Sequence, residues 1–151
     1  NDPLAMRQMG GKRANEGDYK SAFEYWTKAA DLGNALAHSD LSVMYDLGQG
    51  VEKDEKKALH HWEEAAIGGH PAARHNLAAI EMKNGRPERA VKHLIIAANM
   101  GFEDSMKELW KCYAGGYISK DDLNATLRTH HDAVEATKSP QRKAFEEVWD
   151  G

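Results

Sequence analysis

Apolar residues recur along most of the chain with the spacing of a helix face. The segment Ala22-x3-Trp26-x2-Ala29-Ala30 carries them at offsets of 4, 7 and 8 residues. These offsets fall on one stripe of a helix with 3.6 residues per turn. A strand would alternate apolar and polar residues, and the sequence shows no such alternation. The pattern therefore predicts a protein made of helices.

The same pattern repeats. It returns 36 residues later as Ala58-x3-Trp62-x2-Ala65-Ala66-x2-Gly69, and after a further 32 residues as Ala90-x3-Leu94-x2-Ala97-Ala98-x2-Gly101. A second, weaker pattern precedes each copy, as Ala5 with Met9, Ala37 with Leu41 and Ala73 with Leu77, and it occurs once more after the last copy as Ser105 with Leu109. Each repeat is therefore predicted to be a pair of helices.

The residue types indicate how these helices pack. Recurring alanines allow neighbouring backbones to approach closely, and Trp26, Trp62 and Leu94 fill the remaining space. Gly33, Gly69 and Gly101 stand where each second helix has to end, because glycine adopts the left-handed turn without a steric penalty.

One stretch resembles a known family. Ala37-x3-Leu41-Ser42-x-Met44-Tyr45-x2-Gly48-x-Gly50-Val51-x2-Asp54, followed by the Ala-rich second helix to Gly69, is similar to a full Sel1-like repeat, a relative of the tetratricopeptide repeat. The resemblance implies an all-α fold, a right-handed α-solenoid of antiparallel helix pairs with C-terminal capping helices. It implies a single repeat domain over 1–151, divided into a degenerate repeat of tetratricopeptide length at 2–33, the full repeat at 34–69, a short repeat at 70–101, a degenerate last repeat at 102–137 and a capping helix at 138–151.

The C-terminal region departs from the repeat. Ser119-x2-Asp122 predicts a helix start, with the helix running to about Thr137. Ser139-Pro140 predicts a second start, because proline is tolerated at the first helical position. Phe145, Val148 and Trp149 then share one face. We interpret 119–150 as a cap on the last repeat; the alternative is a docking helix for a second copy or for another domain.

Composition narrows the class of protein. The chain has 20 Lys and Arg against 24 Asp and Glu, a formal charge of -4, with both signs mixed along the sequence. This argues against a nucleic-acid ligand, and no apolar run is long enough to span a membrane. The single cysteine, Cys112, cannot form an intramolecular disulfide. An intracellular, cytoplasmic location is favoured by default.

No group of residues predicts catalysis. The adjacent pairs His60-His61 and His130-His131 point about 100° apart on a helix, so neither can hold one metal ion, and no metal or cofactor is expected. Cys112 aligns with the apolar Met44 and is expected to be buried and unreactive. Glu81 stands in the place of Tyr45; a solvated carboxylate is favoured over a polar contact in the groove. We therefore predict that the chain is not an enzyme.

Binding, in contrast, has a predicted location. In the related tetratricopeptide architecture, the face opposite the core of each first helix lines a concave groove, so the resemblance implies a binding surface of Arg7, Leu36, Ser39, Val43, Asp46, His75, Ala79, Met82, Lys107 and Lys111. We interpret the chain as a protein–protein interaction module, an adaptor or scaffold, whose partner carries an acidic peptide segment. Two alternatives remain open: the three basic residues of this set are ordinary solvated charges, or the chain is a structural module that forms a homo-oligomer through its C-terminal helices.

Overall fold

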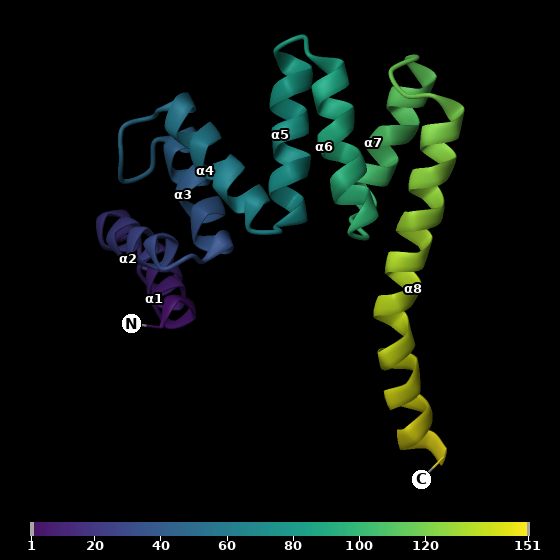
Figure 1. The fold of residues 1–151 in the computed structure, drawn as a ribbon. Coiled ribbons are helices and arrows are strands. Elements are labelled where there is room, and N and C mark those ends of the chain that lie inside the picture. Colours follow the sequence, from purple (N-terminus) through teal and green to yellow (C-terminus); the bar gives the residue numbers. More distant parts are fainter. Residues whose placement is uncertain (1, 151) are drawn as a thin grey trace. The chain divides into compact units, whose positions relative to one another are not determined.

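The computed structural model describes residues 2–150, apart from the side chains of Ser139 and Asp150. These residues form the helices α1 (Pro3–Asn15), α2 (Tyr19–Asp31), α3 (Ala35–Leu47), α4 (Glu55–Ile67), α5 (Pro71–Lys83), α6 (Pro87–Asn99), α7 (Glu103–Ala114) and α8 (Lys120–Asp150). The predicted all-α fold of helix pairs is confirmed (Figure 1). The chain divides into two compact units, residues 1–77 and residues 78–151, which are described one at a time.

Short polar side chains define where the helices begin. The backbone N–H groups of Ser21, Ala37 and Lys57 donate to side-chain oxygens of Asp18, Asn34 and Asp54, at 3.1, 2.9 and 3.1 Å. These contacts satisfy N–H groups that have no partner inside the helix. The predicted ends of α2, α4 and α6 are confirmed, because φ is 90°, 88° and 90° at Gly33, Gly69 and Gly101.

The core of unit 1 is built largely from alanine. Ala29, Ala30, Ala37 and Leu41 form one buried cluster between α2 and α3, on which Trp26 packs half-buried. A second cluster joins α4 to the first part of α5 through Ala65, Ala66, Ala73 and Leu77, with Trp62 half-buried against it. The repeating alanines thus lie between helices, as predicted from their spacing.

A buried hydroxyl fixes α3 against α4. The side chain of Ser42 is fully buried, and its Oγ lies 3.0 Å from the carbonyl oxygen of Ala58 and 3.1 Å from that of His38. Both neighbours are acceptors, so the single hydroxyl proton is available to either one. A small polar residue at this position therefore links the two helices of the full repeat.

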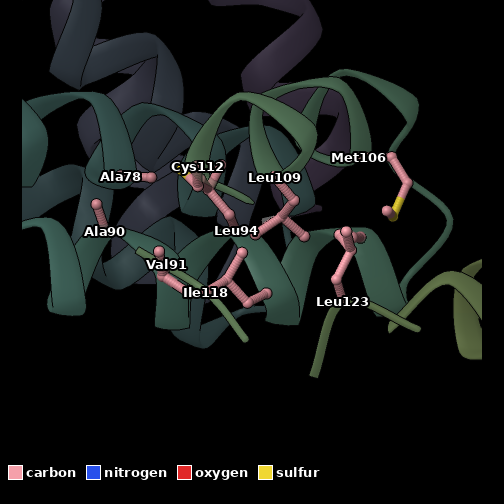
Figure 2. Close-up of a cluster of buried hydrophobic side chains, with 10 residues drawn as sticks. Ala78, Ala90, Val91, Leu94, Met106, Leu109, Cys112, Ile118 and Leu123 are labelled. Atoms are coloured by element: carbon pink, nitrogen blue, oxygen red, sulfur yellow. The ribbon is translucent and has the colours of Figure 1, made fainter. Parts of the chain in front are cut away.

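The core of unit 2 holds larger side chains. Figure 2 shows its buried cluster, to which α6, α7, the loop after α7 and the start of α8 contribute together with Ala78 of α5. The cluster comprises Ala78, Ala90, Val91, Leu94, Ala98, Met106, Leu109, Cys112, Ile118 and Leu123. The prediction that Cys112 is a core residue is confirmed, and burial raises the pKa of its thiol. An electrically neutral thiol in this place acts as a small apolar side chain.

The predicted core face of α1 is wrong in part. Ala5 and Met9 are exposed, whereas Met6 packs against the first cluster of unit 1 and Gly10 is buried. The equivalent residues of α3 are buried because α2 lies against them. Among the described residues no helix precedes α1, so this side of it remains in contact with solvent.

The helix start predicted at Ser139-Pro140 is also wrong. A single helix, α8, runs from Lys120 to Asp150 with Pro140 inside it. Inside a helix, proline removes one backbone hydrogen bond and crowds the carbonyl group four residues earlier, but its φ of about -65° is itself helical. The helix tolerates these costs and continues past Pro140. The start predicted at Ser119 is confirmed, because its Oγ accepts from the backbone N–H of Asp122 at 3.1 Å.

Only the first part of α8 packs on the rest of unit 2. Leu123 is buried and Leu127 packs against the cluster, while Figure 1 shows the second part extending past the end of α7. The exposed fractions of Phe145, Val148 and Trp149 are 63%, 79% and 74%. The first part of α8 covers a core, and the second part presents apolar side chains to solvent.

Candidate functional site

The outer face of α3 presents an apolar stripe, which we call the α3 stripe: Leu36, Val43 and Leu47. The exposed fractions of these side chains are 39%, 41% and 60%. Val43 and Leu47 lie seven and eleven residues along from Leu36, so the turns of the helix bring all three to one side, opposite the buried Ala37 and Leu41. Asp46 is exposed at the edge of the stripe.

An ion pair lies beside this stripe, where Arg7 of α1 meets Asp40 of α3. Arg7 of α1 donates from Nε to Oδ2 of Asp40 at 2.7 Å, and from Nη2 to Oδ1 of the same carboxylate at 3.4 Å. Burial raises the pKa of the Asp40 carboxyl, and the hydrogen bond from Arg7 opposes that rise. The interpretation of Arg7 as a solvated cation is therefore wrong, because a carboxylate 33 residues away in the sequence accepts its hydrogen bonds.

The remaining predicted groove residues of unit 1 are less accessible. Ser39 and His75 are both half-buried. The Oγ of Ser39 has no hydrogen-bond partner among the residues that the structure describes. The polar atom of Ser39 is thus placed beside the α3 stripe without a protein group to satisfy it.

In unit 2, the predicted residues lie on two helices. Ala79 and Met82 are exposed on α5, and Lys107 and Lys111 are exposed on α7. The Nζ of Lys111 lies 3.0 Å from Oε1 of Glu108 on the same helix. Both lysines therefore present charge to solvent, and Lys111 also forms an ion pair with Glu108.

A cleft of about 390 Å³ is lined by residues of α7 and α8. Its lining combines apolar groups with charges of both signs: Glu103, Met106, Lys107, Trp110, Leu127, His130, His131, Val134, Glu135 and Lys138. The ring of His130 closes one side, with Nδ1 2.8 Å from the carbonyl oxygen of Ala98 and Nε2 3.0 Å from Oε2 of Glu103. His130 therefore ties α8 to both α6 and α7.

The sequence did not reveal a cluster of aromatic rings in unit 1. The ring of His61 stacks on Tyr45 with centroids 5.7 Å apart, and Tyr45 in turn contacts Phe23 edge-on at 5.9 Å. The Nδ1 atoms of His38 and His61 are 3.0 Å apart. One ring has to donate and the other accept, so this contact requires at least one neutral histidine.

Burial favours the neutral form of both histidines. It lowers the pKa of His38, and burial together with the neighbouring His38 and His60 lowers the pKa of His61 to about 4. One sequence signal pointed to this cluster: His61 aligns with Tyr25, and each precedes a large packing residue. Nothing in the sequence indicated that His38 would contact His61.

Glu81 corrects a further expectation. Its exposed fraction is only 7%, so the solvated interpretation is wrong. The Nε atoms of Arg86 and Arg89 lie 2.8 and 3.6 Å from its Oε2, an arrangement made possible by the turn at Gly85. Glu81 thus joins the end of α5 to the start of α6 through an ion pair.

Two kinds of site are absent from the described part of the chain. In residues 2–150, no helix combines the length and apolarity needed to cross a lipid bilayer. The same residues contain no group of three or more His, Cys, Asp or Glu side chains placed to hold a metal ion.

Comparison with known proteins gives a consistent result. The Sel1 repeat family model matches residues 3–34, 35–70 and 71–102. The chain is 24% identical over 180 residues to mouse DAP3-binding cell death enhancer 1, covering 93% of this chain and 35% of that protein. It is 27% identical over 128 residues to chitin synthase regulatory factor 2 of Schizosaccharomyces pombe, covering 80% of this chain and 25% of that one.

A solved structure shares the fold. The Sel1 repeat protein from Oxalobacter formigenes superimposes with a TM-score of 0.68 at 23% identity, over 86% of this chain and 56% of that one. The chain spans 35% of the mouse protein and 25% of the Schizosaccharomyces pombe protein, about a third or less of each.

Proposed function

Because the chain belongs to the Sel1 repeat family, we propose that it is a protein-binding module that carries out no reaction of its own. Sel1 repeat proteins generally mediate protein–protein interactions, and the scaffold is typically non-catalytic. The observation that supports the proposal most strongly is the α3 stripe, where three large apolar side chains are exposed on one side of a helix.

The α3 stripe suits a segment that offers apolar side chains of its own. Transfer of apolar surface out of water contributes about 25 cal/mol per Å². Burial of Leu36, Val43 and Leu47 against a partner therefore contributes favourably to the free energy of binding. The Arg7–Asp40 pair beside them adds polar groups that are already held in place. A few half-exposed side chains and one ion pair make a small site, so we expect affinity of about 1 µM or weaker.

The lysines of α7 are a separate feature that favours an acidic partner. Lys107 and Lys111 are exposed and one turn apart on the same helix. Exposed charges of this kind speed encounter and reject partners of like charge more than they add affinity. We therefore include an acidic segment in the partner proposed for this chain.

The test is a binding comparison with matched variants. We expect Val43→Asp to lose, in a pull-down from native extract, proteins that the parent chain retains, because a carboxylate then interrupts the α3 stripe. Ile67→Asp is the control: Ile67 is a strongly exposed apolar residue of unit 1 outside the stripe. If Val43→Asp and Ile67→Asp keep the same partners as the parent, the α3 stripe is not the binding surface. Lys107→Glu with Lys111→Glu in the same experiment tests the acidic preference.

A second candidate function is self-assembly, which one observation favours. Phe145, Val148 and Trp149 are exposed together at the end of α8, and the rings of Phe145 and Trp149 lie 5.8 Å apart. Exposed apolar groups that gather on one face commonly mark an interface. This surface belongs to unit 2 and is independent of the α3 stripe.

A further inference from the structure

The uncovered part of α8 continues a stripe that the same helix buries nearer its start. Leu127, Val134 and Val148 are separated by multiples of seven residues, and Phe145 falls on the same side. In the first part of α8 this stripe packs on α6 and α7. In the second part the direction of the stripe is unchanged, but no described residue of unit 2 covers it.

The charges beside this stripe are ordered along the helix. Arg142 lies next to Phe145, and Glu146 follows one turn later on the same flank. The side chain of Arg142 is exposed, and its guanidinium lies 3.9 Å from Oε2 of Glu135. In a parallel pairing of two such helices, this flank of one helix would meet the opposite, uncharged flank of the other, so Arg142 and Glu146 would gain no partner. In an antiparallel pairing, the flank of one helix meets the same flank of the other in reverse order, so each Arg142 meets a Glu146.

We propose that the segment 138–150 of α8 pairs with the same segment of a second copy, antiparallel and across a two-fold axis near Ala144. Phe145, Val148 and Trp149 of both copies then form the apolar centre, and two Arg142–Glu146 pairs flank it. Such an interface is self-complementary, because each residue contacts its counterpart in return. The inference rests on the self-assembly candidate above and adds the partner's orientation.

The apolar surface available sets the strength of the pairing. An aromatic side chain buries about 150–250 Å², so the four aromatic rings of two copies remove roughly 600–1,000 Å² from water. Stable specific interfaces bury about 1,200–2,000 Å². The dimer is therefore weak, and we expect half of the chains to be paired at a concentration on the order of 100 µM.

Sedimentation velocity of the complete chain from ~5 µM to ~1 mM tests the pairing. We expect the parent to dimerise, and Arg142→Glu or Glu146→Arg to weaken the dimer about ten-fold, because each places like charges opposite one another. The exchange of both residues, Arg142→Glu with Glu146→Arg, should restore the dissociation constant to within about two-fold. Circular dichroism checks that each variant keeps the helix content of the parent.

Lys143 and Glu147 provide matched controls. Both lie on the opposite face of α8, about 160° from Phe145, so Lys143→Glu and Glu147→Arg change the net charge by the same amounts without approaching the interface. We expect both to dimerise as the parent does.

The outcomes separate the two levels of the proposal. A parent chain that is monomeric at every concentration overturns self-assembly itself. A dimer that is insensitive to Arg142 and Glu146, that the exchange does not restore, or that the control variants weaken equally overturns the antiparallel pairing and leaves self-assembly standing.

Discussion

Gly10 offers the sharpest test of how the helices pack. It lies inside α1 and faces the indole ring of Trp26 from α2. A Cβ at this position would overlap Cδ1 and Nε1 of that ring and would lie 3.0 Å from Cε2. The same indole donates from Nε1 to the carbonyl oxygen of Arg7 at 3.1 Å. Gly10→Ala must therefore displace the ring or separate the helices.

The sign of the change in the free energy of unfolding follows from three competing contributions. Alanine is better than glycine in a helix by about 1 kcal/mol. Overpacking costs about 1–3 kcal/mol, and loss of the Trp26 hydrogen bond adds about 1 kcal/mol. We expect Gly10→Ala to lower the free energy of unfolding by about 1–3 kcal/mol. A methyl group added at the next residue, Gly11, would meet no other group within 4 Å, so Gly11→Ala should be stabilising by about 1 kcal/mol.

Urea denaturation followed by circular dichroism measures both variants, which should differ by about 2–4 kcal/mol. The chain has four tryptophans, each with one indole N–H resonance in an NMR spectrum. Displacement of Trp26 should shift one of these resonances. If Gly10→Ala is as stable as Gly11→Ala, Trp26 does not lie against α1.

Two further predictions concern histidine and the C-terminus. Because the folded pKa of His61 is lowered to about 4 from a usual 6.5, the unfolded chain takes up protons first, so stability is complete above pH 6.5 and falls as pH drops toward 4. Allowing for partial exposure, urea denaturation should show a loss of about 1 kcal/mol at pH 5 relative to pH 7.5; a His61→Phe variant that loses as much as the parent would contradict this. Removal of residues 139–151 should leave the thermal midpoint within about 2 °C of the parent and reduce binding of an apolar dye, because Phe145, Val148 and Trp149 cover none of the described core of unit 2. A large fall in the midpoint would show that this segment caps the core.

Local spacing was enough to predict the helices and their pairing. An apolar stripe recurring every repeat determines which side of each helix is buried, and Gly33, Gly69 and Gly101 determine where helices end. Cys112 was predictable as a core residue for the same reason, since it shares a register position with Met44. These inferences use only neighbours along one helix or the same position in the next repeat.

The rest depended on contacts between residues distant in sequence or on neighbours that one repeat lacks. The pairing of Arg7 with Asp40 was not predictable, because the two residues lie on different helices and 33 residues apart. Glu81 was expected in solvent, but the turn after α5 returns two arginines to it. Ala5 and Met9 fit the repeat pattern but have no preceding helix to cover them among the described residues.

The helix start predicted at Pro140 was wrong for a different reason. Its preference for a helix start is a statistical tendency of the first turn, and it competes with the continuity of a helix already begun at Ser119. Likewise, the groove residues Leu36 and Val43 are exposed as expected, but exposure alone does not identify what they bind. Their role stays a prediction.

The exposed side of α1 has a consequence for engineering. Ala5 and Met9 occupy the positions of Ala37 and Leu41, against which Ala29 and Ala30 pack in the full repeat. A helix pair fused ahead of Pro3, with two consecutive alanines in its second helix, would meet the same kind of surface that α2 meets on α3. The array can thus be lengthened from this side by copying its own joint, without redesign of any interior side chain.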